Sequence, residues 1–232
     1  MKALILAAGR GTRLGAAADG RPKGLVEVGG MTLLERQLGI LYACGIERTC
    51  IVTGYQFAQI EQCFGGRVDY RHNPFFAQSN NAVSFLFARD WVADDDVIVL
   101  YADLLYAPEI LDIALQSRGD ISLLVDATAI DPGHALVSIR ETAVRAIGAQ
   151  LPLDQADARF IGIAKFSRRG LHDFLAELEG AVKAGAKDEY YTSGLARLLA
   201  QGYPIEAVDV AGREWAEIDT ADDLERAHGK WG

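Results

Sequence analysis

No apolar run in the 232-residue sequence approaches the length of a membrane-spanning helix, and we find no internal repeat, low-complexity stretch or linker. Because a helix needs about 20 consecutive apolar residues to cross a bilayer, we expect no membrane-spanning segment and no membrane partner. A single lysine and a strand-like run open the sequence, without a cleavage site for an export signal, so we expect a cytoplasmic protein. Its 50% of hydrophobic residues are typical of a globular domain.

Cysteine and histidine are scarce, and neither has the spacing of metal ligands. The three cysteines, Cys44, Cys50 and Cys63, form no C-x-x-C pair and lie among apolar residues, so we expect buried free thiols. The histidines also follow no ligand spacing, and we expect structural or exposed roles for His72, His134, His172 and His228.

Positive charge is in deficit overall but concentrated in one place. The sequence has 23 Lys and Arg against 32 Asp and Glu, a net charge of −9, so no global basic field is available to bind nucleic acid. Four cations nevertheless fall within one short stretch, where only Asp19 opposes them: Arg10, Arg13, Arg21 and Lys23. Focused positive charge on an acidic protein predicts a site for a small anionic molecule.

The same stretch combines a buried strand with a glycine-rich loop. Residues 3–7 form an apolar run of the length expected for a strand covered on both faces. Small residues at positions 7–9 allow a ligand to approach the main chain, and successive exposed N–H groups there make an anion cradle. With the adjacent cations, this arrangement predicts a polyphosphate site.

Two common phosphate-binding loops do not match. The dinucleotide motif G-x-G-x-x-G fails because the third glycine after Gly9 and Gly11 is Gly15, one residue late. The P-loop spacing is present from Gly15 to Gly20, but arginine and Pro22 follow where the motif needs lysine and a hydroxyl residue. Proline also has no N–H to offer a phosphate.

Strand-like and helix-like segments alternate along the chain, which predicts an α/β fold with a parallel sheet. Strands are expected at 3–7, 49–53, 68–70, 97–101, 119–125, 160–166 and 204–210, with a hairpin at 135–147. Helices are expected to begin at the capping box Thr32–Glu35, after Asn80–Asn81 and near Pro108. A short helix is expected over 57–64, and further helices over 171–182, 190–200 and 221–228.

Acidic residues and asparagines at the ends of these segments are candidate site residues. Either Asn80 or Asn81 could be a helix N-cap, but two in a row exceed what a cap needs, and asparagine suits reading the edge of a base. Asp103 follows the 97–101 strand, where ligands of parallel sheets bind. Glu217 and Asp219 alternate about one residue and so point to one face of an extended segment.

Several segments resemble the nucleotidyltransferase superfamily that makes nucleotide-diphosphate sugars and alcohols. Leu6–Gly15 followed by Pro22-Lys23 resembles its signature L-A-A-G-x-G-x-R-[LM]…P-K, and Tyr101-Ala-Asp103 resembles a metal-binding segment. The W-x-E-I-D-T-x-x-D-L string beginning at Trp215 resembles the second metal-binding segment. Residues 73–84 are similar to the cytidylyltransferase branch, which acts on phosphocholine, phosphonates or inositol phosphate, and lack the Gln-Pro-Leu-Gly-Thr-like segment of sugar-phosphate members.

The resemblance implies a single Rossmann-like domain over 1–232, with a mostly parallel central sheet flanked by helices and a small β-hairpin lid. Residues 1–125 would form the nucleotide-binding half and 126–232 the acceptor-binding half and lid. The implied reaction is transfer of a cytidylyl group from CTP to a small phosphate- or phosphonate-bearing acceptor, with Mg²⁺ as cofactor and pyrophosphate as product.

The resemblance also assigns residues. Arg13 would grip the departing phosphates and Lys23 would bridge the α-phosphate and the acceptor. Asp103 and Asp219, with Glu217, would hold Mg²⁺. The nucleotide-binding residues would be Leu6, Ala7, Ala8, Gly9, Gly11, Thr12, Asn80 and Asn81.

Two departures from the family pattern keep alternatives open. Ala149 stands where many relatives carry a lid lysine, so either Lys165 or Arg159 supplies that cation or the substrate needs less charge. Thr192 follows the tyrosine pair where relatives often have an acidic residue, which argues against phosphocholine. The alternatives are a sugar-1-phosphate nucleotidyltransferase using UTP, dTTP or GTP, and a non-catalytic nucleotide-binding regulatory protein. The acceptor's identity stays open, as does whether the chain forms a homo-oligomer.

Overall fold

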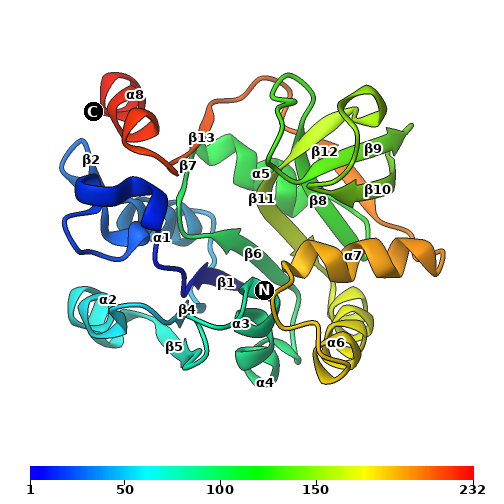
Figure 1. Ribbon diagram of the computed structural model, residues 1–232, viewed down its shortest axis with the longest axis horizontal. Coiled ribbons are helices and arrows are strands. Elements are labelled where there is room, and N and C mark those ends of the chain that lie inside the picture. Colours follow the sequence, from blue (N-terminus) through cyan, green and yellow to red (C-terminus); the bar gives the residue numbers. More distant parts are fainter.

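A nine-stranded sheet runs through the centre of the computed structural model, which describes residues 1–232 (Figure 1). Its strands lie in the order β5-β4-β1-β6-β11-β8-β12-β10-β9. Their bounds are, in that order, Asp69–His72, Thr49–Thr53, Lys2–Ala7, Val97–Tyr101, Ala158–Phe166, Ile121–Asp126, Glu206–Asp209, Ala143–Gly148 and Leu136–Arg140.

The direction of the strands changes across this sheet. Strands β5, β4, β1 and β6 are parallel, as the alternating pattern predicts. Strand β11 then runs antiparallel to both β6 and β8, and only β12 pairs in parallel beyond it. The α/β class is confirmed, but the sheet is mixed rather than mostly parallel. The sequence pattern identifies strands without stating which neighbour each one pairs with, so it does not predict their relative direction.

Helices cover both faces of the sheet because β1 sends alternate side chains to opposite sides. Leu4 and Leu6 pack with residues of α3, α6 and α7, while Ala3 and Ile5 pack with residues of α1, α2 and α5. The helices are α1 (Leu33–Ala43), α2 (Phe57–Phe64), α3 (Asn81–Phe87), α4 (Arg89–Val92), α5 (Pro108–Gln116), α6 (Arg168–Lys183), α7 (Tyr191–Ala200) and α8 (Ala221–Trp231). No helix is both long and apolar enough to cross a membrane.

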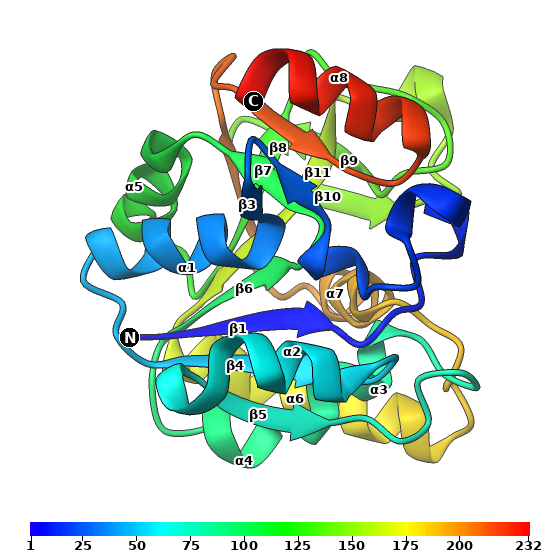
Figure 2. The same cartoon turned by 90° about the vertical axis from the view of Figure 1, so that its left-hand side faces the viewer.

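A third, smaller hydrophobic cluster lies beside the opening loop. It joins the 3₁₀ segment η1 (Thr12–Ala18), the ribbon β2–β3 (Glu27–Val28 and Met31–Thr32), the ribbon β7–β13 (Leu104–Tyr106 and Trp215–Glu217) and α8. Figure 2 shows α8 and β13 side by side, next to β7. Its buried residues include Leu14, Leu105, Ile218 and Ala227, so the two ends of the chain share one apolar base.

Two other expectations have mixed outcomes. The 135–147 hairpin forms, and its strands β9 and β10 are the far edge of the large sheet, while its role as a lid stays a prediction. All three cysteines are free thiols, but only Cys50 is buried. The prediction of burial is wrong for Cys63, which is exposed near the end of α2, and for Cys44, which is half-buried just after α1.

Candidate active site

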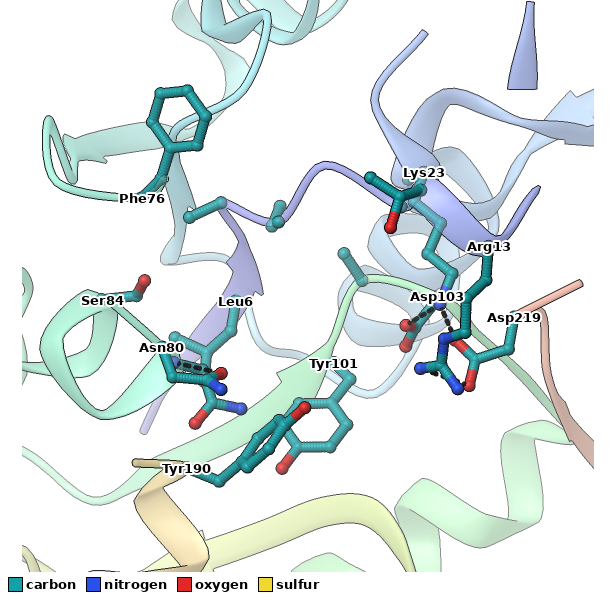
Figure 3. Close-up of a pocket in the computed structure, with 18 of the residues that line it drawn as sticks. Leu6, Arg13, Lys23, Phe76, Asn80, Ser84, Tyr101, Asp103, Tyr190 and Asp219 are labelled. Atoms are coloured by element: carbon teal, nitrogen blue, oxygen red, sulfur yellow. Dashed lines mark hydrogen bonds and ion pairs between the residues drawn. The ribbon is translucent and has the colours of Figure 1, made fainter. Parts of the chain in front are cut away.

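A cavity of about 370 Å³ opens where β1 and β6 end (Figure 3). Every candidate site residue lines it: Leu6, Ala7, Ala8, Gly9, Gly11, Thr12, Arg13, Lys23, Asn80, Asn81, Asp103, Glu217 and Asp219. In Figure 3, charged side chains gather at one end and Asn80, Leu6, Ser84 and Phe76 at the other.

Lys23 is the centre of the charged end. Its Nζ donates to Asp103 Oδ2 at 2.6 Å and also to Asp219 Oδ1. Arg13 Nη2 contacts the other oxygen of Asp219 at 2.9 Å. Burial alone would lower the pKa of Lys23, but the two carboxylates outweigh that effect and raise the pKa. Lys23 is therefore a fully charged ammonium at neutral pH.

Main-chain pairing brings the two acidic segments together, although they lie far apart in sequence. Strands β7 and β13 are antiparallel with Leu104 opposite Glu217, and Ile218 N donates to Asp103 O at 2.9 Å. Asp103 thus precedes one strand of the ribbon and Asp219 follows the other. This register places both carboxylates at the same end of the ribbon, where each contacts Lys23.

Close packing positions the Lys23 segment. Lys23–Leu25 forms a 3₁₀ turn, and a Cβ at Gly24 would lie 2.7 Å from Leu34 Cγ on α1. The side chain of Lys23 then passes Gly11, whose φ of +61° is the left-handed conformation that glycine adopts without strain. Gly24 thus lets the turn pack closely against α1, and Gly11 leaves room for the stem of the Lys23 side chain on its way to the carboxylates.

Glu217 has its own set of partners. It forms an ion pair with Arg159, and His134 Nε2 lies 3.9 Å from its Oε2. Burial and the nearby charges of Asp103 and Asp219 raise the pKa of Glu217 to about 7, against the opposing effect of Arg159. Three carboxylates crowded together in this way would be stabilised by a further cation.

The donor set fits a divalent metal ion. Asp103 Oδ1 is buried without a hydrogen-bond partner, and ligand atoms of His134, Glu217 and Asp219 lie within 4.8 Å of one another. Asp103 and Asp219 both contact one ammonium, so their oxygens are close enough to share an ion. Carboxylate oxygens are the ligands that Mg²⁺ prefers.

The asparagine pair has local structural roles at the other end of the cavity. Asn80 is the N-cap of α3, because its Oδ1 accepts from Asn81 N at 2.8 Å. Asn81 Oδ1 accepts from Tyr191 N at 2.7 Å, which ties α3 to the start of α7. The cap interpretation is thus correct for one asparagine, and both side chains still line the cavity.

Of the other cations considered from the sequence, Arg159 forms an ion pair with a candidate metal ligand, and Arg10, Arg21 and Lys165 do not. Arg21 pairs with Glu27 at the surface, and the guanidinium of Arg10 lies over the ring of Phe76, 5.6 Å from its centre. Lys165 donates to main-chain oxygens of Leu115 and Ser117, away from the cavity. Of the two proposed replacements for the lid lysine, only Arg159 lies beside the site, in contact with Glu217.

Sequence reasoning missed the aromatic walls of the cavity and the pairing of Arg159. Phe76, Tyr101 and Tyr190 line the cavity. Tyr101 could have been predicted from the sequence, because it is the last residue of the strand that precedes Asp103. The Arg159–Glu217 pair depends on how β11 and β13 meet in space, which no local pattern encodes.

The glycine-rich loop, its basic side chains and the two acidic segments meet at one cavity of the α/β sheet, which agrees with the nucleotidyltransferase class that the sequence predicts. The chain belongs to the family described as the MobA-like NTP transferase domain, whose model matches residues 3–172.

Individual relatives agree with this class. The chain is 28% identical, over 98% of its length, to CMP-5'-(3-aminopropyl)phosphonate synthase of Streptomyces rubellomurinus, and spans 38% of that protein. It is 25% identical to CTP:phosphoglutamine cytidylyltransferase of Campylobacter jejuni, with 97% of this chain and 98% of the relative covered. CTP:phosphocholine cytidylyltransferase from Streptococcus pneumoniae has the same fold, with a TM-score of 0.78, 21% identity, and 100% and 99% of the two chains covered.

Proposed function

We propose that the protein transfers a cytidylyl group from CTP to a small acceptor that carries a phosphate or phosphonate, and releases pyrophosphate. The observation that carries this proposal is the position of Lys23, whose ammonium lies between Asp103 and Asp219 at one end of a cavity that Asn80 and Asn81 line at the other. The curated relatives described above, which use CTP or make a CMP adduct, support the choice of nucleotide.

The chemistry needs positioning more than proton transfer. An oxygen of the acceptor's phosphate or phosphonate is already anionic near neutral pH and attacks the α-phosphorus of CTP. The new O–P bond forms as the bond to the bridging oxygen breaks, and the β- and γ-phosphates leave together. No general base is required, and catalysis consists of aligning two anions and stabilising the charge that develops between them.

Arg13 and Lys23 supply the charge for this step. We assign the departing phosphates to Arg13, since a guanidinium offers two parallel donors and 67% of its side chain is exposed. Lys23 is held by two carboxylates and is only 14% exposed, so it acts as a fixed point charge for the α-phosphate and the acceptor. The main chain of residues 6–9 and the two asparagines would hold the base, with Gly11 and Thr12 beside the phosphates.

Mg²⁺ is the proposed cofactor. Asp103 and Asp219 would hold the ion, with Glu217 beside them, which agrees with the unpartnered Oδ1 of Asp103 and the raised pKa of Glu217. When bound, the ion would neutralise negative charge on the two reactants.

A pyrophosphate-release assay tests the proposal. Purified protein with Mg²⁺ is incubated with CTP, UTP, dTTP or GTP, together with phosphocholine, aminoethylphosphonate, other phosphonates, inositol phosphate or a sugar 1-phosphate. We expect release with CTP and one of the phosphate or phosphonate acceptors, a CMP adduct by mass spectrometry, and loss of activity with EDTA. Release only with UTP, dTTP or GTP and a sugar 1-phosphate would replace the proposal with the sugar-nucleotide alternative. No release with any pair would favour a regulatory nucleotide-binding protein.

A further inference from the structure

Gln37 is a buried polar residue in the middle of α1 and is not among the residues that line the active-site cavity. Its exposed fraction is 1%, although α1 is otherwise held to the sheet by apolar residues such as Leu34 and Leu41. An uncharged amide in such a place needs hydrogen bonds to offset the loss of water.

The amide nitrogen of Gln37 makes two hydrogen bonds, both to the main chain around Asp103. Nε2 donates to Tyr101 O at 3.0 Å and to Leu104 O at 2.9 Å. These two carbonyl groups flank Ala102 and Asp103, so a single side chain holds both ends of the turn that presents the carboxylate.

The main-chain hydrogen bonds of this turn use different atoms from those that Gln37 contacts. Ala102 N donates to Leu6 O at 3.2 Å, which ties the turn to β1, and Asp103 O accepts from Ile218 N, which ties it to the second acidic segment. Neither bond involves the carbonyls of Tyr101 or Leu104. The side chain of Gln37 approaches these carbonyls from α1.

The amide oxygen of Gln37 accepts no hydrogen bond. This atom, Oε1, is buried. All the hydrogen bonding of this side chain is therefore directed at the Asp103 turn. A residue kept only to fill volume would be better served by methionine or leucine, which would leave no buried amide oxygen unpartnered.

The helix that carries Gln37 also supports Lys23. Leu34, one turn before Gln37, packs against Gly24, and Leu33 N donates to Val26 O at 3.0 Å. Helix α1 begins at a complete capping box between Thr32 and Glu35, which fixes its first turn. One rigid helix thus touches the segments on both sides of the Lys23–Asp103 contact.

We propose that Gln37 is a positioning residue for Asp103: its amide sets the place of the Tyr101–Leu104 turn, and through it the distance between the Asp103 carboxylate and Lys23. The inference rests on the proposed function for its consequence in catalysis. Its structural part, that the amide fixes the turn, stands on the two hydrogen bonds alone.

The test uses Gln37→Met, which keeps the length of the side chain and removes its N–H donors, with Gln155→Met in an exposed turn as the matched control. We expect kcat to fall by about 10- to 100-fold, the scale set by a misplacement of about 1 Å, while KM for CTP changes by less than about threefold. Gln37→Glu should be at least as impaired, because an ionised carboxylate would face two carbonyl oxygens.

Hydrogen exchange at the Ile218 amide provides a readout independent of turnover. This amide donates to Asp103 O, so a loosened turn should raise its exchange rate about tenfold or more in Gln37→Met, with the Ile5 amide of β1 unchanged. Uniformly faster exchange at both amides, or normal kcat with unchanged exchange at Ile218, would overturn the inference. If the wild-type protein transfers no nucleotidyl group, the proposed function fails, and the exchange rates alone decide whether Gln37 fixes the turn.

Discussion

Lys23→Met isolates the contribution of one ammonium, because methionine keeps most of the side-chain stem and removes the charge. In the wild-type protein this ammonium contacts Asp103 and Asp219, and 14% of the side chain is exposed. The variant leaves the two carboxylates facing each other, with Arg13 still paired to Asp219.

Both turnover and stability should change. Removing one preorganised electrostatic group from a site of this kind lowers kcat by about 10²- to 10³-fold. Removing one partner of a buried ion pair costs about 3–5 kcal/mol, and the remaining Arg13 contact should reduce that loss to about 1–3 kcal/mol. For a chain of this size each kcal/mol corresponds to about 2–4 °C in Tm.

Pyrophosphate release with CTP and the best acceptor measures the first effect, and thermal unfolding followed by circular dichroism measures the second. Lys183→Met is the matched control, since Lys183 is 74% exposed and pairs with Glu179 within one helix. A Lys23→Met protein with turnover within about threefold of wild type would refute the role assigned to this residue.

Three further outcomes are expected. Asp103→Asn keeps the shape of the side chain and removes its charge, so pyrophosphate release should fall by about 10²-fold or more and the concentration of Mg²⁺ needed for half-maximal rate should rise; an unchanged Mg²⁺ requirement would contradict the metal assignment. Burial alone would raise the pKa of Asp126, but hydrogen bonds from Trp215 and Thr128 outweigh it and hold the pKa below its usual value. The wild type therefore loses stability as pH falls below about 4, and Asp126→Asn should show a shallower loss in urea unfolding between about pH 5 and pH 2; equal slopes would contradict this. Burial raises the pKa of the Cys50 thiol to about 12, so brief iodoacetamide treatment at pH 8, read by mass spectrometry, should modify Cys63 and spare Cys50 until the chain is denatured.

Local patterns in the sequence predict local structure well. The apolar run at 3–7 is β1, and the Thr32–Glu35 capping box begins α1. Each of these signals involves residues within four positions of one another, so the physical interaction that produces it is visible in the sequence itself.

The residues that line the cavity were also predictable, but for a different reason. Motifs that match a known family place Lys23, Asp103 and Asp219 in one site without any account of how the chain brings them there. The geometric account is the β7–β13 ribbon and the bond from Ile218 N to Asp103 O, and neither leaves a local signal.

Contacts between distant segments were largely missed. The antiparallel direction of β11, the Arg159–Glu217 pair and the hydrogen bonds from Gln37 each join residues more than fifty positions apart. Periodicity reports whether a side chain faces inward, but it does not report which inward-facing neighbour it meets. His134 illustrates the limit, since it was expected to be structural or exposed and lies 3.9 Å from Glu217.

The small cluster beneath the opening loop couples the basic loop to the second acidic segment. Leu14 packs in this cluster with Ile218 and Ala227, which lie on either side of the start of α8. A variant truncated before residue 215 would keep Arg13 and Lys23 but lose Asp219 and the helix that packs beside the loop. Such a variant should therefore lose the site even though its glycine-rich loop is intact.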